Sequence, residues 1–328
     1  MNRRYLLRMP APKRLTIILA FAAIYLIWGS TYLGILFAIQ SIPPFLMAGA
    51  RFFISGLIMY AIARLGGAPS PKPITWRSAL IIGGCLLLCG NGGVSLAEQW
   101  VPTGLASLLV ATVPIYMALL GWLWGVAPRP SPIVWLGLLG GFIGVGVLVG
   151  PALTTLSSPS SNHLGLGMCV LLVGSLIWSV GSLYSRTAVS SPSLIMAAGQ
   201  QMICGGGLLF LVGLIVGEPS RFHFGRVSSL SLWAFVYLVL IGALIGYTAY
   251  FWLLRHCDPA KVATYAYVNP VVAVLLGTLF ANEPLSLRTV LGAALIVGSV
   301  AVVITAQQFG SKTIRKSAAP SEAVDCAT

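Results

Sequence analysis

The sequence predicts an all-α integral membrane protein with ten transmembrane helices in two inverted five-helix repeats and both termini in the cytoplasm. Three observations predict this class. First, 58% of the 328 residues are hydrophobic and only 8% are charged, whereas about 25% of the residues in a soluble domain are charged. Second, apolar runs of about 20 residues, the length that crosses a bilayer, recur along the chain. Third, the two halves of the chain share a pattern of residues.

Ten apolar runs are candidates for membrane helices, joined by short segments rich in Pro, Gly and Ser. They cover 15–39, 44–64, 76–97, 103–125, 133–150, 164–186, 192–216, 229–254, 259–281 and 286–306. The first run is too long for the apolar region of a signal peptide, so we interpret it as an uncleaved membrane helix. The chain then divides into a basic cytoplasmic tail (1–14), a first five-helix repeat (15–150), an extracytoplasmic connector (151–163), a second five-helix repeat (164–306) and a disordered cytoplasmic tail (307–328).

The distribution of Lys and Arg predicts the orientation, because cytoplasmic loops of membrane proteins carry an excess of basic residues. With the N-terminus inside, fifteen basic residues lie in cytoplasmic segments, and three, Arg221, Arg226 and Arg288, lie in extracytoplasmic loops. This asymmetry agrees with an even number of helices. It also accounts for the formal charge of +13 without a nucleic-acid partner, since no basic run is interleaved with aromatic residues in a way that would follow a backbone.

An internal repeat relates the two halves of the chain. The segment "IWGSTYLG" from Ile27 corresponds to "IWSVGSLY" from Ile177 at an offset of 150 residues. Likewise, "VATVPIYMALLG" (110–121) corresponds to "AYVNPVVAVLLG" (266–277) at an offset of 156. Because each copy holds an odd number of helices, the second copy must cross the membrane in the opposite sense. Inverted repeats are typical of secondary transporters, whose substrate sites lie near the midplane of the bilayer between the repeats.

Two matched prolines, Pro114 and Pro270, fall near the centres of the fourth and ninth candidate helices. A proline leaves the carbonyl four residues earlier without its helical partner, here the carbonyls of Val110 and Ala266. At membrane depth such a carbonyl is tolerated only where protein groups or a water-filled cavity satisfy it. The pair therefore predicts two helix breaks beside a cavity. The alternative is a kink that only adjusts the packing of the helices.

Several segments resemble one family of membrane proteins. They are "YLIWGSTYLGI" (25–35), "PPFLMAGARF" (43–52), "GNGGVSLAEQWVPTGLASLLVATVP" (90–114), "YAYVNPVVAVLLG" (265–277) and "NEPLS" (282–286). They make the chain similar to the drug/metabolite transporter superfamily, in its ten-helix EamA-type branch, and most of all to the YedA-like exporters. The resemblance covers nearly the whole membrane region and implies a secondary transporter of the inner (plasma) membrane. Its segments are specific for the family and not for a substrate.

One acidic position of this family differs between the two repeats. The family has a glutamate in the turn before the last helix of a repeat. Glu283 fills this place in the second repeat, whereas Ala127 stands there in the first. Glu283 is therefore expected to be structural, near the N-terminus of the tenth helix, where the helix dipole favours a negative charge.

Polar and aromatic residues inside the candidate helices predict a central cavity. We expect its lining to consist of Trp28, Tyr32, Arg51, Asn91, Thr112, Trp178, Ser182, Gln201, Tyr247, Tyr250, Tyr265 and Asn269. Trp28 and Tyr32 share a helix face, as do their repeat mates Trp178 and Ser182, because residues four apart lie on the same side of a helix. An apolar, aromatic cavity suits amphipathic metabolites, amino acids or drugs. The alternative for each single residue is ordinary helix packing.

Two charged residues carry open alternatives. Arg51 lies about 10 Å into the second helix, at 1.5 Å per residue, where a charge is costly unless it has a partner. It either contacts an anion or a carboxylate, or braces the second and third helices. Glu98, at the outer end of the third helix, is either a proton-coupling group or gate, or the partner of Arg51.

Other classes of function fit the sequence less well. The three histidines fall in loops or at the ends of spans, and no nucleophile–base pair or acid dyad lies within the spans, so no enzyme is expected. Cys85 and Cys89 have no His, Asp or Glu near them in the sequence, so neither a metal nor another cofactor is expected. No nucleotide-binding loop is present, and any driving force is therefore a gradient and not ATP. The expected partners are a small-molecule substrate and membrane lipid. A channel-like facilitator without ion coupling is the alternative function.

Overall fold

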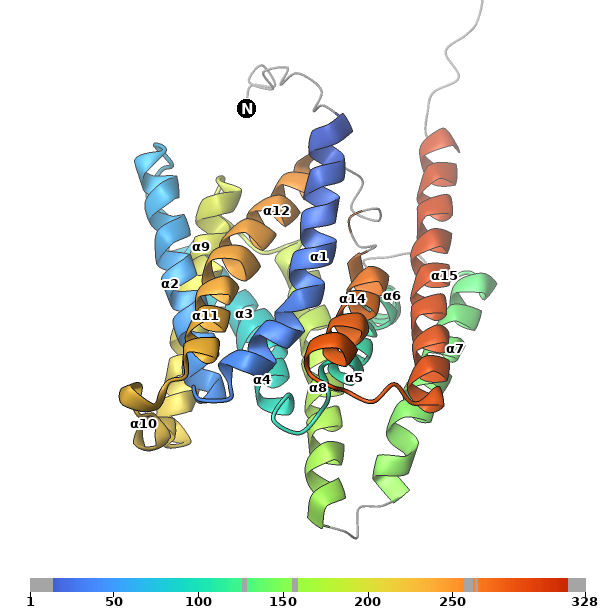
Figure 1. Ribbon diagram of the computed structural model, residues 1–328. Coiled ribbons are helices and arrows are strands. Elements are labelled where there is room, and N and C mark those ends of the chain that lie inside the picture. The colour runs from blue at the N-terminus through green and yellow to red at the C-terminus, as the bar shows by residue number, and fades with distance from the viewer. Residues whose placement is uncertain (1–13, 126–128, 155–158, 257–261, 263–264, 318–328) are drawn as a thin grey trace, which may run out of the picture.

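The structure is a computed structural model that describes residues 14–125, 129–154, 159–256, 262 and 265–317 (Figure 1). All regular elements in this part of the chain are helices. The all-α class predicted from the sequence is confirmed. Seven helices are long and apolar enough to cross a membrane, and three shorter helices, Pro132–Leu148, Val268–Phe280 and Leu287–Val303, are also apolar. Ala127 and most of the segment before the ninth candidate helix lie outside the described residues.

The helices of the first half follow the first five candidate runs. The first two are α1 (Arg14–Ala38) and α2 (Pro44–Leu65). The third run consists of α3 (Pro73–Gly83), the π-helical segment η2 (Gly84–Gly92) and α4 (Gly93–Ala97). The fourth is divided into α5 (Thr103–Val110) and α6 (Val113–Leu123), and the fifth is α7 (Pro132–Thr154).

The second half repeats this order. It begins with α8 (Pro159–Ser185) and α9 (Leu194–Ile215), followed by the short α10 (Glu218–Arg221) and the 3₁₀ helix η3 (Phe224–Arg226). The next run consists of α11 (Ser229–Tyr237), the π-helical segment η4 (Leu238–Ile245) and α12 (Gly246–His256). The last two helices are α14 (Tyr265–Phe280) and α15 (Leu287–Ser317). Each half therefore has a π-helical segment at the corresponding place.

The last helix, α15, is longer than the last apolar run. It continues to Ser317, whereas the run ends at residue 306. No proline interrupts the chain between Pro284 and Pro320, so the backbone hydrogen bonds of the helix can continue past the apolar run.

The Pro- and Ser-rich connections start the helices. Proline stands at the beginning of α2 (Pro44) and of α3 (Pro73). Proline is favourable there because the N–H group that it lacks would have no hydrogen-bond partner in the first turn of a helix. Ser193 caps α9 by accepting a hydrogen bond from Met196 N at 3.4 Å, and Ser228 caps α11 by accepting one from Ser231 N at 3.1 Å. These short loops bring consecutive helices side by side.

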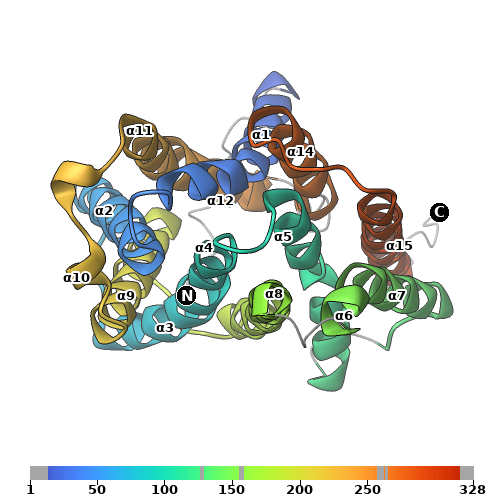
Figure 2. The ribbon, with the colours of Figure 1, turned by 60° about the horizontal axis from the view of Figure 1, so that its bottom comes forward.

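Glycines let α2 and α9 pack backbone against backbone. A Cβ atom added at Gly56 would lie 2.9 Å from Gly199 O, and one added at Gly206 would lie 3.0 Å from Gly49 O. Gly49 and Gly199 correspond in the repeat, as do Gly56 and Gly206, at the offset of 150. The contact of Gly56 with Gly199 is therefore repeated as the contact of Gly206 with Gly49. This is the pattern of two antiparallel helices related by a twofold axis. Figure 2 shows this pair on one side of the bundle, and α7 with α15 on the other.

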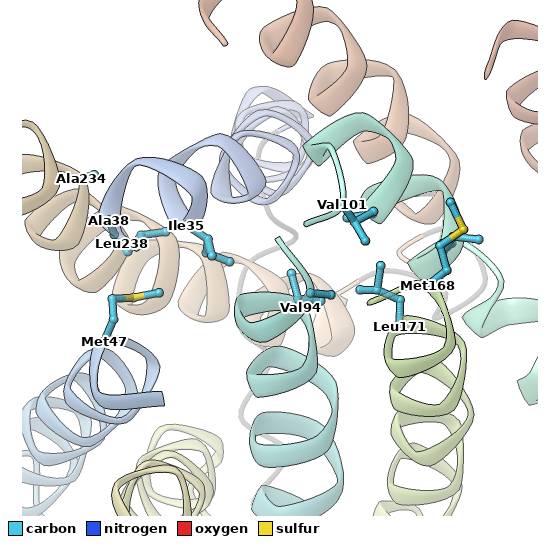
Figure 3. Close-up of a cluster of buried hydrophobic side chains, with 12 residues drawn as sticks. Ile35, Ala38, Met47, Val94, Val101, Met168, Leu171, Ala234 and Leu238 are labelled. Atoms are coloured by element: carbon cyan, nitrogen blue, oxygen red, sulfur yellow. The ribbon is translucent and has the colours of Figure 1, made fainter. Parts of the chain in front are cut away.

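A buried apolar cluster lies toward one end of the bundle, here called the α10 end, where α1, α4, α9 and α14 finish (Figure 1). Nine members are labelled in Figure 3: Ile35, Ala38, Met47, Val94, Val101, Met168, Leu171, Ala234 and Leu238. They come from both halves of the chain. In α1 these residues follow Tyr32, and in α2 Met47 precedes Arg51, so the cluster lies beyond the predicted cavity residues, toward the α10 end.

Two glutamates near the α10 end hold helix starts of the other repeat. Glu283 accepts hydrogen bonds from Thr103 N at 2.6 Å and Gly104 N at 3.1 Å, at the start of α5. Glu218 accepts bonds from the first amides of α2. The structural role expected for Glu283 therefore needs a correction, since the carboxylate binds the free amides of α5 and not those of the tenth helix. Carboxylates are favourable there because the N-terminus of a helix carries a partial positive charge and unpaired N–H groups.

Candidate functional site

A cavity of about 120 Å³ lies between the two halves of the molecule. From the first half, the predicted residues Trp28, Tyr32, Arg51 and Asn91 line it. From the second half, Trp178, Tyr247, Tyr265, Asn269 and Pro270 line it. The structure thus brings together predicted residues that are up to 242 positions apart, from Trp28 to Pro270. A second hollow, beside Gln201 and Met202, measures only about 10 Å³.

Trp28 is the centre of an aromatic cluster. Its ring centroid lies 5.3 Å from that of Tyr247, 5.1 Å from Tyr250 and 5.0 Å from Tyr265. The last pair is edge-to-face, with an angle of 87° between the planes, a geometry that the aromatic quadrupoles favour. These contacts join α1 to α12 and α14, and they fix the wall on which a flat ligand could pack.

Two glycines place the tryptophans, and the arrangement repeats across the cavity. A Cβ atom added at Gly246 would lie 2.5 Å from Trp28 Nε1, and one added at Gly90 would lie 2.5 Å from Trp178 Cε3. Trp28 and Trp178 are repeat mates at the offset of 150, and Gly90 and Gly246 are mates at the offset of 156. Each tryptophan therefore rests on a glycine of the opposite repeat. Any larger residue at either glycine would displace the indole.

The two prolines act differently. Pro114 stands in the first turn of α6, and the fourth helix is broken between Val110 and Val113, as predicted. The break predicted at Pro270 is wrong, because α14 continues through this residue. Lateral packing supports α14 here: a Cβ atom added at Gly29 of α1 would lie 3.2 Å from Asn269 O. Val110 and Ala266, whose carbonyls the prolines leave free, both border the cavity.

The side-chain amide of Asn269 stabilises the same contact between α1 and α14. When its nitrogen faces the backbone carbonyls, it can donate to Tyr25 O at 3.2 Å and to Tyr265 O at 3.3 Å. Asn269 is buried and also borders the cavity. Its amide nitrogen therefore satisfies backbone acceptors next to the proline.

Arg51 is a buried cation at the edge of the cavity. It is 3% exposed, and its Nε has no hydrogen-bond partner among the described residues. A Cβ atom added at Gly242 would lie 3.2 Å from Arg51 Nη2, so the guanidinium group lies against the backbone of η4 in the other repeat. Gly242 offers no side-chain acceptor. Among the described residues, no carboxylate oxygen of Glu98 is hydrogen-bonded to this charge in the cavity wall.

Glu98 is buried without a partner as well. It follows α4, one residue past the end of the candidate span Pro73–Ala97, and it is 3% exposed. Neither carboxylate oxygen has a hydrogen-bond partner among the described residues. Burial, and next the charge of Glu283, raise the pKa of the Glu98 carboxyl well above its ordinary value, and Arg51 opposes this only in part. The pairing with Arg51 considered from the sequence is not formed.

Five of the residues predicted to line or gate the cavity do not border it. The Thr112 hydroxyl bonds Leu109 O at 2.6 Å, and the Ser182 hydroxyl bonds Trp178 O at 2.8 Å, so each satisfies its own helix. Tyr250 packs behind Trp28 and Tyr265. Gln201 lies on a face of α9 that borders a separate hollow of about 10 Å³ beside Met202. Glu98 is not among the residues that line the cavity.

Sequence reasoning missed several lining residues, of which Ser175 is the most polar. Its hydroxyl is buried without a hydrogen-bond partner among the described residues, and the residue borders the cavity together with Thr31 and Ser107. Ser175 precedes the predicted Trp178 by three positions, so the periodicity of the helix could have indicated it. Serines are common in membrane helices because small residues let neighbouring helices approach closely, so the residue type alone did not indicate a lining role.

The sequence matches the model of the EamA-like transporter family over residues 15–150 and again over 165–305. The chain belongs to this family. The two matches begin and end within one residue of the predicted repeats, 15–150 and 164–306. The resemblance noted in the sequence is confirmed, and so is the expected multi-pass protein of the inner (plasma) membrane.

Relatives of this EamA-like protein span most of its length. It is 38% identical over 288 residues to the uncharacterized inner membrane transporter YedA of Escherichia coli (strain K12), covering 87% of this chain and 89% of YedA. It is 27% identical to the uncharacterized transporter YvbV of Bacillus subtilis (strain 168), over 89% of this chain and 92% of the relative. Protein PecM of Dickeya dadantii (strain 3937) is 26% identical, over 92% and 95% of the two chains.

One crystal structure shares the fold of this EamA-like protein. It matches with a TM-score of 0.57 at 21% sequence identity, over 88% of this chain and 97% of that chain. At this level of identity the likeness concerns the arrangement of the helices and not the ligand.

Proposed function

We propose that this protein is a secondary transporter that exports small amphipathic metabolites, amino acids or drugs across the inner membrane by alternating access. The observation that carries the proposal is a single cavity lined by both repeats, with Trp28 and Trp178 seated on glycines of the opposite repeat. When each repeat supplies half of a site, movement of one repeat against the other exposes the site to each side of the membrane in turn.

The proposed topology has ten membrane spans in inverted repeats, with both termini in the cytoplasm. The positive-inside asymmetry of the sequence supports the orientation. The antiparallel contact of α2 and α9 supports the inversion, since the contacting glycines are exchanged by the repeat. The α10 end is then extracytoplasmic.

Glu98 is the proposed proton-coupling or gating group. It stands in sequence between the members Ala97 and Val101 of the cluster at the α10 end, and both its oxygens lack hydrogen-bond partners among the described residues. A neutral carboxyl is tolerated in such a place, whereas an ionised one needs a partner or water. Loss of the proton would therefore favour a state in which this end of the bundle is hydrated.

A counterflow assay in proteoliposomes tests the proposal. Liposomes loaded with an excess of an unlabelled compound are diluted into the labelled compound, over a panel of aromatic amino acids, other amphipathic metabolites and cationic dyes. A carrier gives a transient accumulation above equilibrium, whereas a channel-like facilitator only equilibrates. Empty liposomes that accumulate the label equally, or a panel without any counterflow, would contradict the proposal.

Variants connect the transport to the cavity. Tyr265→Phe and Asn269→Ala are expected to reduce counterflow at least tenfold, as expected for the loss of a polar contact that positions a ligand. Tyr60→Phe is the control, because this tyrosine packs against Trp76 away from the cavity. Unchanged transport in both cavity variants would show that α14 does not line the path.

Proton coupling is tested separately. An imposed pH gradient should accelerate efflux by the wild type and not by Glu98→Gln.

A further inference from the structure

The lining of the cavity has an unbalanced charge. Arg51 borders it and is 3% exposed. None of the described residues that line the cavity is acidic. The nearest candidate counter-ion is Glu98, but its two oxygens have no hydrogen-bond partner among the described residues, so they do not bind the guanidinium group. The described part of the cavity wall therefore presents one cation and no anion.

A buried cation in a membrane protein needs partners that offset its desolvation, and the guanidinium carbon of Arg51 has one in the Phe52 ring, 4.7 Å from the ring centroid. Charged side chains within membrane helices are costly, face the interior and pair with other groups. The desolvation cost of an ion is several kcal/mol, and it is offset only by close partners. Because the guanidinium of Arg51 lies against Gly242, which has no side chain, a structural brace gains no acceptor from that residue. An anion that enters the cavity would supply the missing partner.

The aromatic residues stand close to this cation. Arg51 Nη2 contacts the position of Gly242, and Trp28 Nε1 contacts the position of Gly246. These glycines are four residues apart on η4 and α12, which is about 6 Å, or about one helical turn. A carboxylate attached to a single ring can span this separation, with the carboxylate at Arg51 and the ring against Trp28.

The volume of the cavity limits the ligand. The space is about 120 Å³, slightly less than the engineered cavity of about 150 Å³ that binds benzene in another protein. This volume sets the upper limit of the ligand at a single ring with a small polar group, and it excludes a dye with several fused rings. The rings of Trp28 and Tyr265, which meet edge to face, offer the flat surfaces that such a ring can pack against.

From this geometry we infer that the cavity binds a small aryl monocarboxylate anion, with the carboxylate on Arg51 and the ring on the aromatic wall around Trp28. Arginine suits this role because its planar fork binds a carboxylate with two hydrogen bonds. A cationic amine is repelled by Arg51, and the ammonium of a zwitterionic amino acid finds no acidic partner among the described lining residues. The inference names the substrate class of the proposed transporter and rests on that function.

Direct binding to the purified protein in detergent tests the charge preference. The probe is radiolabelled phenylacetate, and the competitors are unlabelled phenylacetate, phenylacetamide, phenethylamine and phenylalanine, which keep the ring and change the polar group. We expect phenylacetate to compete at least tenfold better than the neutral amide, the amine and the amino acid, as for the loss of a charge-assisted hydrogen bond. Equal competition by the amide or the amine, or no binding of phenylacetate, overturns the inference.

Variants of Arg51 separate ligand binding from bracing. Arg51→Gln should weaken phenylacetate about 10- to 100-fold and leave phenylacetamide unchanged, because only the acid uses the charge. The affinity of Arg51→Lys for phenylacetate should lie between those of the wild type and Arg51→Gln. Lysine keeps the positive charge but loses the planar guanidinium group that binds a carboxylate with two hydrogen bonds. Arg64→Gln is the matched control, because this arginine is exposed at the end of the same helix, where it donates to Ala68 O. If Arg51→Gln weakens the acid and the amide alike, Arg51 is only a brace and the inference fails.

Transport separates this inference from the proposed function. In proteoliposomes, phenylacetate should show counterflow with the wild type and a loss of at least tenfold with Arg51→Gln. Counterflow of a neutral or cationic compound without any binding of phenylacetate leaves the transporter intact and overturns the inference. Binding of phenylacetate with the predicted dependence on Arg51, but without counterflow of any compound, supports the site and overturns the transporter.

Discussion

At the residue scale, the buried charges fall into two kinds. Glu218 and Glu283 accept hydrogen bonds from backbone amides of another helix. Arg51 and Glu98 are buried with polar atoms that have no partner among the described residues. Buried polar groups are nearly always hydrogen-bonded in proteins, and an exception is costly unless a ligand, water or proton serves it. The hydrogen bonds of the first pair stabilise the fold, and the second pair is the one on which the proposed function depends.

The raised pKa of Glu98 predicts how stability depends on pH. In the unfolded chain a glutamate has a pKa of about 4.3, whereas burial raises the pKa of this carboxyl in the fold. Above about pH 4.3 the folded state thus holds more protons than the unfolded state, and stability falls as the pH rises toward the raised pKa. In Glu98→Gln the melting temperature in detergent should fall less steeply from about pH 5 to pH 8.

The exposed neighbour of Glu98 provides the control for this measurement. Gln99 does not titrate and is exposed, so Gln99→Ala should keep the slope of the wild type. A slope in Glu98→Gln equal to that of the wild type would mean that the Glu98 carboxyl is ionised in the fold.

At the element scale, contacts between the repeats use groups that are hard to replace. The helices α2 and α9 meet at glycines, and the starts of α2 and α5 are held by carboxylates from the other repeat. Positions 68 and 127, at the offsets of 150 and 156 from these glutamates, hold alanines. The carboxylate caps are thus found at the α10 end. The two alanines at the repeat-equivalent positions have no carboxylate and cannot cap a helix in this way.

The glycine contact predicts a strong effect of a single methyl group. A Cβ atom at Gly56 would lie 2.7 Å from Ile203 N, so Gly56→Ala forces α2 and α9 apart. We expect a loss of about 1–3 kcal/mol of stability, as for other overpacked sites, measured as a lower melting temperature in detergent. Gly207→Ala is the control, because an added Cβ there has no neighbour within 4 Å. Equal melting temperatures of the two variants would show that this contact is looser than described.

The carboxylate caps predict a graded loss of stability. Glu283→Ala removes the acceptor of Thr103 N and Gly104 N and should cost about 1–2 kcal/mol, as for other lost helix caps. Glu283→Gln keeps one acceptor oxygen and should lose less. Glu218→Ala should behave like Glu283→Ala, since Glu218 holds α2 in the same manner. If the alanine variants melt at the wild-type temperature, water replaces the carboxylates at no cost.

At the scale of the whole molecule, the apolar cluster and the carboxylate caps both lie toward the α10 end. The cavity residues Ile35, Val94 and Leu171 are also members of this cluster. The cavity wall and the apolar cluster therefore share these three residues. In the proposed mechanism we call this cluster the seal. In the proposed topology this seal faces the outside of the cell, and a transporter would have to open it to release an exported compound.

Cysteine labelling tests this orientation. In a variant that keeps only Cys326, a membrane-impermeant maleimide should label the C-terminal tail after cell lysis and not in intact spheroplasts. In a second variant, in which Cys326 is also replaced, Ser220→Cys places the only thiol at the exposed α10 and should react in intact spheroplasts. The reverse pattern would contradict the cytoplasmic termini and would place the seal on the inner side.

The sequence by itself determined the properties that depend on local composition and on internal matches. Apolar runs of bilayer length, basic loops and the offsets of 150 and 156 predicted a helical membrane protein of two repeats, because lipid imposes the same requirement on every span. Only the tertiary structure decided which side chains meet. Trp28 rests on Gly246, Glu283 binds the start of α5, and Gln201 faces away from the cavity that its repeat mate Arg51 borders. These contacts depend on the rotation and approach of helices more than 100 residues apart, which the period of a single helix does not encode.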